Sequence, residues 1–148
     1  MTELASPPRA KRPVFRNINV FKDLPSYRLP AAGFVSILHR ISGFLMFLLL
    51  PFTIWMFDVS VSSEISFAKF TSAFTKGIGF VPGLFVKLVV LALIWAFLHH
   101  SIAGLRHLWM DTNHSATSKE FGKSSAIATL ALSVGLTVIL GAKLFGAY

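Results

Sequence analysis

The stretch "LVVLALIWAFLHHSIAGLRHLWMD", Leu88 to Asp111, decides the fold class of this chain. Its first part, Leu88 to Leu105, carries no Asp, Glu, Lys or Arg, and the same holds for Ile41 to Phe57 and Ser125 to Ala142. A helix rises about 1.5 Å per residue, so about 20 residues cross the hydrocarbon core of a bilayer. The three runs therefore predict an all-α membrane protein with transmembrane helices near residues 31–57, 82–110 and 124–147.

Composition points to the same class of protein. Of the 148 residues, 54% are hydrophobic and 14% are charged, and the mean hydropathy of +0.68 is far from that of a soluble domain. The chain has no cysteine, so it cannot hold a disulfide, a thiolate nucleophile or a cysteine-ligated iron–sulfur cluster. The net charge of +8 does not indicate a nucleic-acid partner, because the positive residues flank the apolar runs instead of lining one soluble face.

The positive charges also predict how the chain crosses the bilayer. Residues 1–30 form a basic arm with six Lys and Arg residues, whereas the loop after the first helix carries only Lys69 and Lys76. By the positive-inside rule the arm lies in the cytoplasm, and three spans then place the C-terminus outside. We therefore expect a cytoplasmic arm over residues 1–30 and a three-helix transmembrane anchor domain over residues 31–148.

Two of the expected helices carry polar residues at helical spacing, which places them on one stripe of each helix. The stripe of the second helix consists of His100, Gly104, His107 and Asp111. The stripe of the first helix consists of Ser36, Arg40 and Gly43, with His39 beside it. The orientation brings the start of the first helix and the end of the second to the same inner face, so we expect the two stripes to lie near each other.

Most of these residues have ordinary explanations when each is taken alone. Arg40 and Arg106 can extend to lipid phosphates, and Asp111 can neutralise one of them. Gly43 and Gly104 can serve close helix packing, because small residues let transmembrane helices approach each other.

His100 is harder to explain in that way. It precedes Asp111 by eleven residues and so lies on the order of 16 Å deeper along the helix. At that depth an imidazole needs a partner, and neutral imidazole is a good axial ligand for haem iron. Gly104 would leave room for a flat macrocycle, and Arg106 and His107 can pair with its propionates. Zinc is less favoured, because His107 lies two turns away and no cysteine or deep carboxylate completes a tetrahedral set.

Three motifs carry a resemblance to a known family. They are "RP" at Arg12–Pro13, "SILHRISG" from Ser36 to Gly43 and "HSIAGLRHLWMD" from His100 to Asp111. In this order they resemble the cytochrome b membrane-anchor subunit, the C subunit, of succinate dehydrogenase (respiratory complex II). The resemblance extends from about Arg12 to the end of the chain in motif order, helix count and length.

The resemblance implies a subunit of an oxidoreductase with no catalytic residues of its own. Such subunits pair with a second membrane-anchor subunit, share one haem b with it, and dock an iron–sulfur subunit and a flavoprotein subunit on the inner face. Electrons from succinate pass through FAD and iron–sulfur clusters, which belong to those partners only, to ubiquinone or another quinone as substrate. The implied location is the bacterial inner membrane, with the mitochondrial inner membrane as the alternative.

Site residues follow from the matching positions. His100 matches the axial haem ligand, and it is preferred over His99 because it precedes Gly104 by four residues and shares the stripe with His107. The haem pocket and propionate contacts are expected at His39, Arg40, Gly104, Arg106 and His107. The quinone site is implied at Ser36 and Arg40, with Asp111 in support.

Three alternative functions remain open at this point. The related fumarate reductase anchor would run the reaction in the opposite direction, which residue types do not decide. A small transporter or channel subunit would carry its polar stripes on to the outer face, yet the first helix beyond Gly43 and the second before His99 are almost wholly apolar. A purely structural anchor without haem would leave His100 buried with no evident function.

Overall fold

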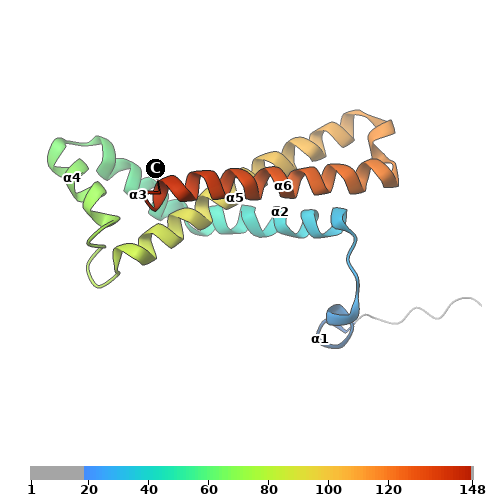
Figure 1. Ribbon diagram of the computed structural model, residues 1–148, viewed down its shortest axis with the longest axis horizontal. Helices are drawn as coiled ribbons and strands as arrows, with labels where there is room; N and C mark the ends of the chain where they lie inside the picture. Colours follow the sequence, from blue (N-terminus) through green and yellow to red (C-terminus); the bar gives the residue numbers. More distant parts are fainter. Residues whose placement is uncertain (1–18, 148) are drawn as a thin grey trace, which may run out of the picture.

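A computed structural model describes residues 19–147, and this part of the chain is built almost entirely of helices. Figure 1 shows three long helices lying side by side, α2 (Ala31–Leu48), α5 (Gly83–Thr112) and α6 (Lys119–Leu144). α5 contacts both of the others, and α2 and α6 also contact each other. Each is long and apolar enough to cross a membrane, so the predicted all-α fold with three such helices is confirmed. Residues 1–18 of the predicted basic arm lie outside the described residues.

The shorter elements lie at the two ends of this bundle. They are α1 (Val20–Asp23), the 3-10 helices η1 (Leu24–Ser26) and η2 (His114–Thr117), α3 (Leu50–Val61) and α4 (Glu64–Ala73). In Figure 1, α1 lies at the end where α2 begins and α5 turns into α6, while α3, α4 and the C-terminus lie at the other end. The polar ends of α2 and α5 therefore share one end of the bundle.

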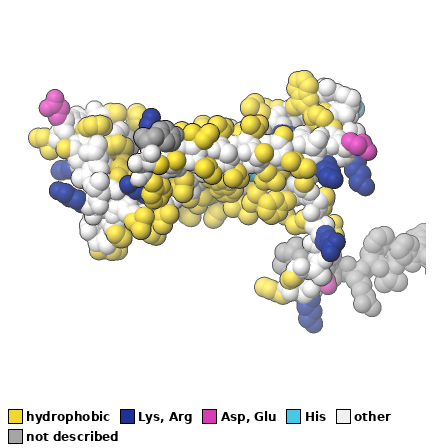
Figure 2. Space-filling model, in the orientation of Figure 1, with side chains coloured by type: hydrophobic (Ala, Val, Ile, Leu, Met, Phe, Trp, Pro, Cys, Tyr) yellow, Lys and Arg dark blue, Asp and Glu magenta, His cyan; other side chains and the backbone are white. Residues whose placement is uncertain are grey.

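Small side chains hold the three helices together. Val35 from α2, Ala103 from α5 and Ala126 from α6 form a fully buried cluster at their junction. Large apolar side chains such as Phe44, Phe97 and Val138 are instead more than 60% exposed. Figure 2 accordingly shows hydrophobic side chains along the body of the molecule and Lys or Arg towards its ends. Close packing through small residues and an apolar exterior are typical of helices in lipid, so the chain is a multi-pass membrane protein.

The first predicted helix differs from the structure. A single helix was expected over residues 31–57, but α2 ends at Leu48 and α3 begins at Leu50. Leu49 between them has φ −91° and ψ 5°, outside the helical pattern of its neighbours. The cause is Pro51, which lacks a backbone N–H and whose ring clashes with the carbonyl four residues earlier in a continuous helix.

Two further helix boundaries differ from the expected ones. The loop expected between the first two transmembrane helices contains α4. Its N-terminus is capped by reciprocal bonds: Ser66 N donates to Ser63 Oγ over 3.1 Å, and Ser63 N donates to Ser66 Oγ over 2.8 Å. The third helix begins at Lys119 instead of residue 124, because the Ser118 hydroxyl accepts a bond of 3.2 Å from Phe121 N and caps the earlier turn.

The membrane orientation gives a direct prediction. If the basic arm lies inside, a reporter fused after Tyr148 should lie on the outer side of the membrane, and a reporter inserted within η2 should lie on the inner side. Paired alkaline phosphatase and fluorescent-protein fusions measure this. Finding both positions on one side of the membrane would rule out the three-span topology.

Candidate functional site

Three histidines from α2 and α5 meet at one place in the bundle. The rings of His39 and His100 are stacked, with centroids 4.1 Å apart and an interplanar angle of 15°. The ring of His107 lies 5.2 Å from that of His39 at an angle of 50°. We call these three residues the histidine cluster. The structure thus brings together two helices whose polar stripes the sequence placed at the same end.

One nitrogen of His100 is fixed by α2. Its Nδ1 lies 3.1 Å from the backbone oxygen of His39 and 3.3 Å from Ser42 Oγ. A carbonyl oxygen can only accept a hydrogen bond, so Nδ1 carries the proton and donates it. In the neutral ring Nε2 then has a free lone pair, which is the tautomer that a metal ligand requires.

Glycine at position 43 allows this close approach. A Cβ built on Gly43 would lie 2.9 Å from His100 Cε1 and 3.2 Å from His100 Nδ1, closer than carbon atoms approach without displacement. Gly104 faces the same cluster less tightly, because a Cβ there would lie 3.6 Å from His39 Nε2. Gly43 therefore determines how near the imidazole of His100 lies to α2.

Replacing Gly43 with alanine should displace the His100 ring or separate α2 from α5. We expect a loss of about 1–3 kcal/mol in stability, the usual cost of overpacking a well-filled interior. Thermal unfolding of the purified complex measures it. Gly135→Ala is the matched control, because a Cβ there meets nothing within 4 Å. Equal unfolding temperatures for the two variants would contradict the close contact at Gly43.

His39 contributes a buried nitrogen without a partner. Its Nε2 makes no hydrogen bond to any described residue and is shielded from solvent. A buried polar group without a hydrogen bond is costly, and native structures rarely leave one unpaired. The nitrogen is therefore suited to a group that this chain does not supply.

The neighbouring His99 points elsewhere, and its Nε2 is likewise buried without a hydrogen bond to any described residue. It is fully buried, its Nδ1 lies 3.1 Å from Ser133 Oγ on α6, and its ring stacks on Trp95 with centroids 5.5 Å apart. Ser133 is also fully buried and donates its own hydroxyl to Leu130 O, so His99 is the donor in this pair. The two adjacent histidines thus face different helices. Nothing in the spacing within α5 could have identified Ser133 as the partner of His99.

Arg106 is directed towards α6 and not towards the histidine cluster. Its Nε donates to Ser125 Oγ over 2.9 Å, and its Nη2 donates to Gly122 O over 3.2 Å. Among the other expected site residues, Arg40 of α2 and Asp111 of α5 are exposed, and Ser36 of α2 is half-buried. Ser42 also contacts the histidine cluster directly, although it is not among the site residues expected from the sequence. Its position three residues after His39 in the same helix is the feature that could have identified it.

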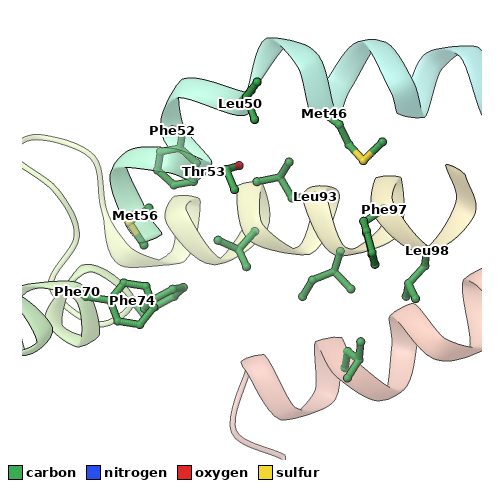
Figure 3. A pocket seen from close by; sticks show the side chains of 13 residues that line it. Met46, Leu50, Phe52, Thr53, Met56, Phe70, Phe74, Leu93, Phe97 and Leu98 are labelled. Atoms are coloured by element: carbon green, nitrogen blue, oxygen red, sulfur yellow. The ribbon is translucent and has the colours of Figure 1, made fainter. Parts of the chain in front are cut away.

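A separate cavity lies in the other half of the bundle. Its volume is about 580 Å³, and most of its lining comes from α3 and α5, with further side chains from α2, α4 and α6. Figure 3 shows the lining side chains converging from these helices, and Thr53 is the single polar residue among the thirteen that line it. A polar transport path would need polar groups here, so the cavity gives the transporter reading no support.

The cluster can supply one well-oriented imidazole nitrogen but not a complete metal site. Within residues 19–147 no three His, Asp or Glu side chains are placed to hold a metal ion together. The described residues alone therefore do not complete the ligand set of a metal at His100.

Comparison with known proteins gives a consistent result. The family model described as succinate dehydrogenase/fumarate reductase transmembrane subunit matches residues 9–140. The succinate dehydrogenase cytochrome b556 subunit of Coxiella burnetii is 33% identical over 132 residues, which cover 89% of this chain and 95% of that protein. The protein of the same name from Paracoccus denitrificans is 30% identical over 131 residues, covering 88% and 90%. The chain belongs to the family of succinate dehydrogenase and fumarate reductase transmembrane subunits.

Proposed function

We propose that this chain is the cytochrome b membrane-anchor subunit of a succinate:quinone oxidoreductase and that His100 is an axial ligand of its haem b. The observation that carries the proposal is the bond from His100 Nδ1 to the carbonyl of His39, at 3.1 Å. Metal-bound histidines almost always hold their other nitrogen in such a bond, which fixes the tautomer and the ring orientation. Both relatives carry the name cytochrome b556, which supports a b-type haem.

The surroundings of His100 fit this group. The ring of His39, with its unpartnered Nε2, lies against His100, and the ring of His107 lies against His39; both are suited to bind haem propionates. Gly104 leaves space along α5, and Arg40 is exposed towards the same end of the bundle. Arg106 supports this pocket indirectly, because its bonds to Ser125 and Gly122 hold α6 against the end of α5. The second axial ligand would come from a partner anchor subunit.

When bound, the haem supplies one-electron redox chemistry, and the residues of this chain orient it. The His100 ring is held rigidly by α2 and presents a single lone pair. Burial of the neighbouring helix faces excludes water, since Val35, Ser42 and Ala103 have no exposed surface. A low local dielectric strengthens each hydrogen bond formed there.

We place the quinone site at the start of α2. Ser36 and Arg40 are one turn apart on the same helix, and Asp111 lies near the end of α5 at the same end of the bundle. The serine hydroxyl can donate to a quinone carbonyl, and the guanidinium can stabilise negative charge on the quinone oxygen as it is reduced. Electrons would arrive from an iron–sulfur subunit docked at this end, which is why the site lies near the membrane surface.

The complete assembly requires three partner subunits in the bacterial inner membrane. They are a second anchor subunit, an iron–sulfur subunit and an FAD-containing flavoprotein. The 148 residues include no cysteine, so the ligands of the iron–sulfur clusters would come from a partner. The names of the relatives specify succinate dehydrogenase, which favours electron flow from succinate to quinone. A fumarate reductase anchor is the alternative within the same family.

Co-purification tests this proposal. The full-length chain, tagged and expressed with the partner subunits of its own organism, should bring down all three and show the absorption bands of reduced haem b in a reduced-minus-oxidised spectrum. Isolation of the assembled complex without any haem signal would overturn the cytochrome assignment. Faster fumarate reduction than succinate oxidation would favour the fumarate reductase alternative.

A further inference from the structure

The hydroxyl of Ser42 lies beside the Nδ1 of the His100 imidazole. Ser42 belongs to α2 and is fully buried. Its Oγ donates to the backbone oxygen of His39 over 2.9 Å and lies 3.3 Å from His100 Nδ1. Serine in a helix often bonds a carbonyl one turn earlier, so this first bond alone needs no functional explanation.

The unusual feature is that Ser42 and His100 share an acceptor. The same oxygen of His39 receives the hydroxyl of Ser42 and the Nδ1–H of His100, which lies 3.1 Å away. A carbonyl oxygen has two lone pairs and is already engaged by its own helix, so two further donors compete for it. The Ser42 hydroxyl competes for His39 O, and its own oxygen accepts from the same Nδ1–H over 3.3 Å, so both contacts weaken the hydrogen bond from His100 to the His39 carbonyl.

The strength of that bond bears on the haem if His100 ligates it, so this step rests on the function proposed above. A stronger bond from Nδ1–H raises the basicity of the other ring nitrogen, and a more basic ligand favours ferric over ferrous iron. Hydrogen bonding around the ligands is one of the means by which proteins adjust a haem potential. We propose that Ser42 is a positioning residue that keeps the haem reducible by moderating the bond between His100 and the His39 carbonyl.

A redox titration of the purified, haem-loaded complex tests this role. In the Ser42→Ala variant the hydroxyl no longer competes with His100 for His39 O. The hydrogen bond from Nδ1 should therefore strengthen, and the midpoint potential of the haem should fall. We expect about a threefold to tenfold lower ratio of ferrous to ferric haem at a fixed ambient potential, the range that one hydrogen bond supports. The Ser42→Cys variant retains the volume and only a weak donor, so its shift should have the same sign and be smaller.

Ser133→Ala is the matched control. It removes the hydroxyl partner of the adjacent His99, a contact of 3.1 Å between two fully buried residues, without touching His100. Both alanine variants should lower the unfolding temperature of the complex, because each removes a buried hydrogen bond. Only the Ser42 variants should shift the midpoint potential, and a merely structural role for Ser42 would not produce that difference.

The outcomes separate this inference from the proposed function. If the wild-type complex binds no haem, the proposed function fails first. If the haem is present and the Ser42 variants titrate at the wild-type potential, or at a higher one, the shared-acceptor role is wrong while the ligand assignment stands. If Ser42→Ala does not assemble, the sign of the shift in Ser42→Cys decides the question.

Discussion

Replacing His100 with leucine should remove the haem b absorption from the purified complex. The Nδ1 of this imidazole is held by a backbone carbonyl, which leaves Nε2 for the iron. Loss of an outer-shell partner alone typically costs about 10–100-fold in metal affinity, so loss of the ligand itself should lower the affinity for haem by at least that factor. Haem extracted per complex, together with the reduced-minus-oxidised spectrum, measures this effect.

His99→Leu is the control for the His100 variant. Its ring bonds Ser133 and stacks on Trp95 inside the bundle, so its loss should lower the unfolding free energy by about 1–3 kcal/mol while haem remains bound. Loss of haem in His99→Leu with retention in His100→Leu would move the ligand assignment by one residue. If both variants retain haem, neither histidine of α5 is the haem ligand.

Quinone reduction should depend on Ser36 and Arg40. Removing one preorganised donor from a site that stabilises developing charge typically costs about 10²–10³-fold in rate, and we expect Ser36→Ala and Arg40→Leu to lower succinate–quinone reductase activity by about 10-fold or more. Oxidation of succinate with a soluble dye should be unchanged, because the dye takes its electrons before the quinone site. The ratio of the two activities is the relevant measurement.

A serine elsewhere at the same end of the bundle controls for nonspecific effects. Ser124 is exposed near the start of α6 and bonds only within its own helix, to Phe121 O over 3.2 Å. Ser124→Ala should leave both activities at the wild-type level. A parallel fall of both activities in the Ser36 and Arg40 variants would indicate failed assembly, and normal quinone reduction in both would exclude the proposed site.

The membrane-spanning helices could be predicted from the sequence because lipid imposes a simple rule. An uncharged run of sufficient length must form a helix to satisfy its backbone hydrogen bonds, and all three expected runs lie in α2–α3, α5 and α6. The break at Leu49 was missed because Pro51 lies within an apolar run, where composition alone does not separate one helix from two. α4 was missed because its capping serines lie in a segment too short to cross the membrane.

The candidate site was only partly predictable for a different reason. Spacing within one helix places Gly104 and His107 on the side of His100, but it carries no information about the partners that other helices supply. The bond from Arg106 to Ser125, the bond from His99 to Ser133 and the fit of Gly43 against His100 all depend on how the helices pack. The opposite roles of two adjacent histidines therefore became visible only in three dimensions.

The most direct test of the account is a cryo-electron microscopy map of the intact complex with its partner subunits. We predict a macrocycle against the shared face of α2 and α5, its iron at bonding distance from His100 Nε2, and its propionates directed to the end where the rings of His39 and His107 lie. A macrocycle bound elsewhere, an iron coordinated through His99, or density for the complete complex without a haem would contradict it.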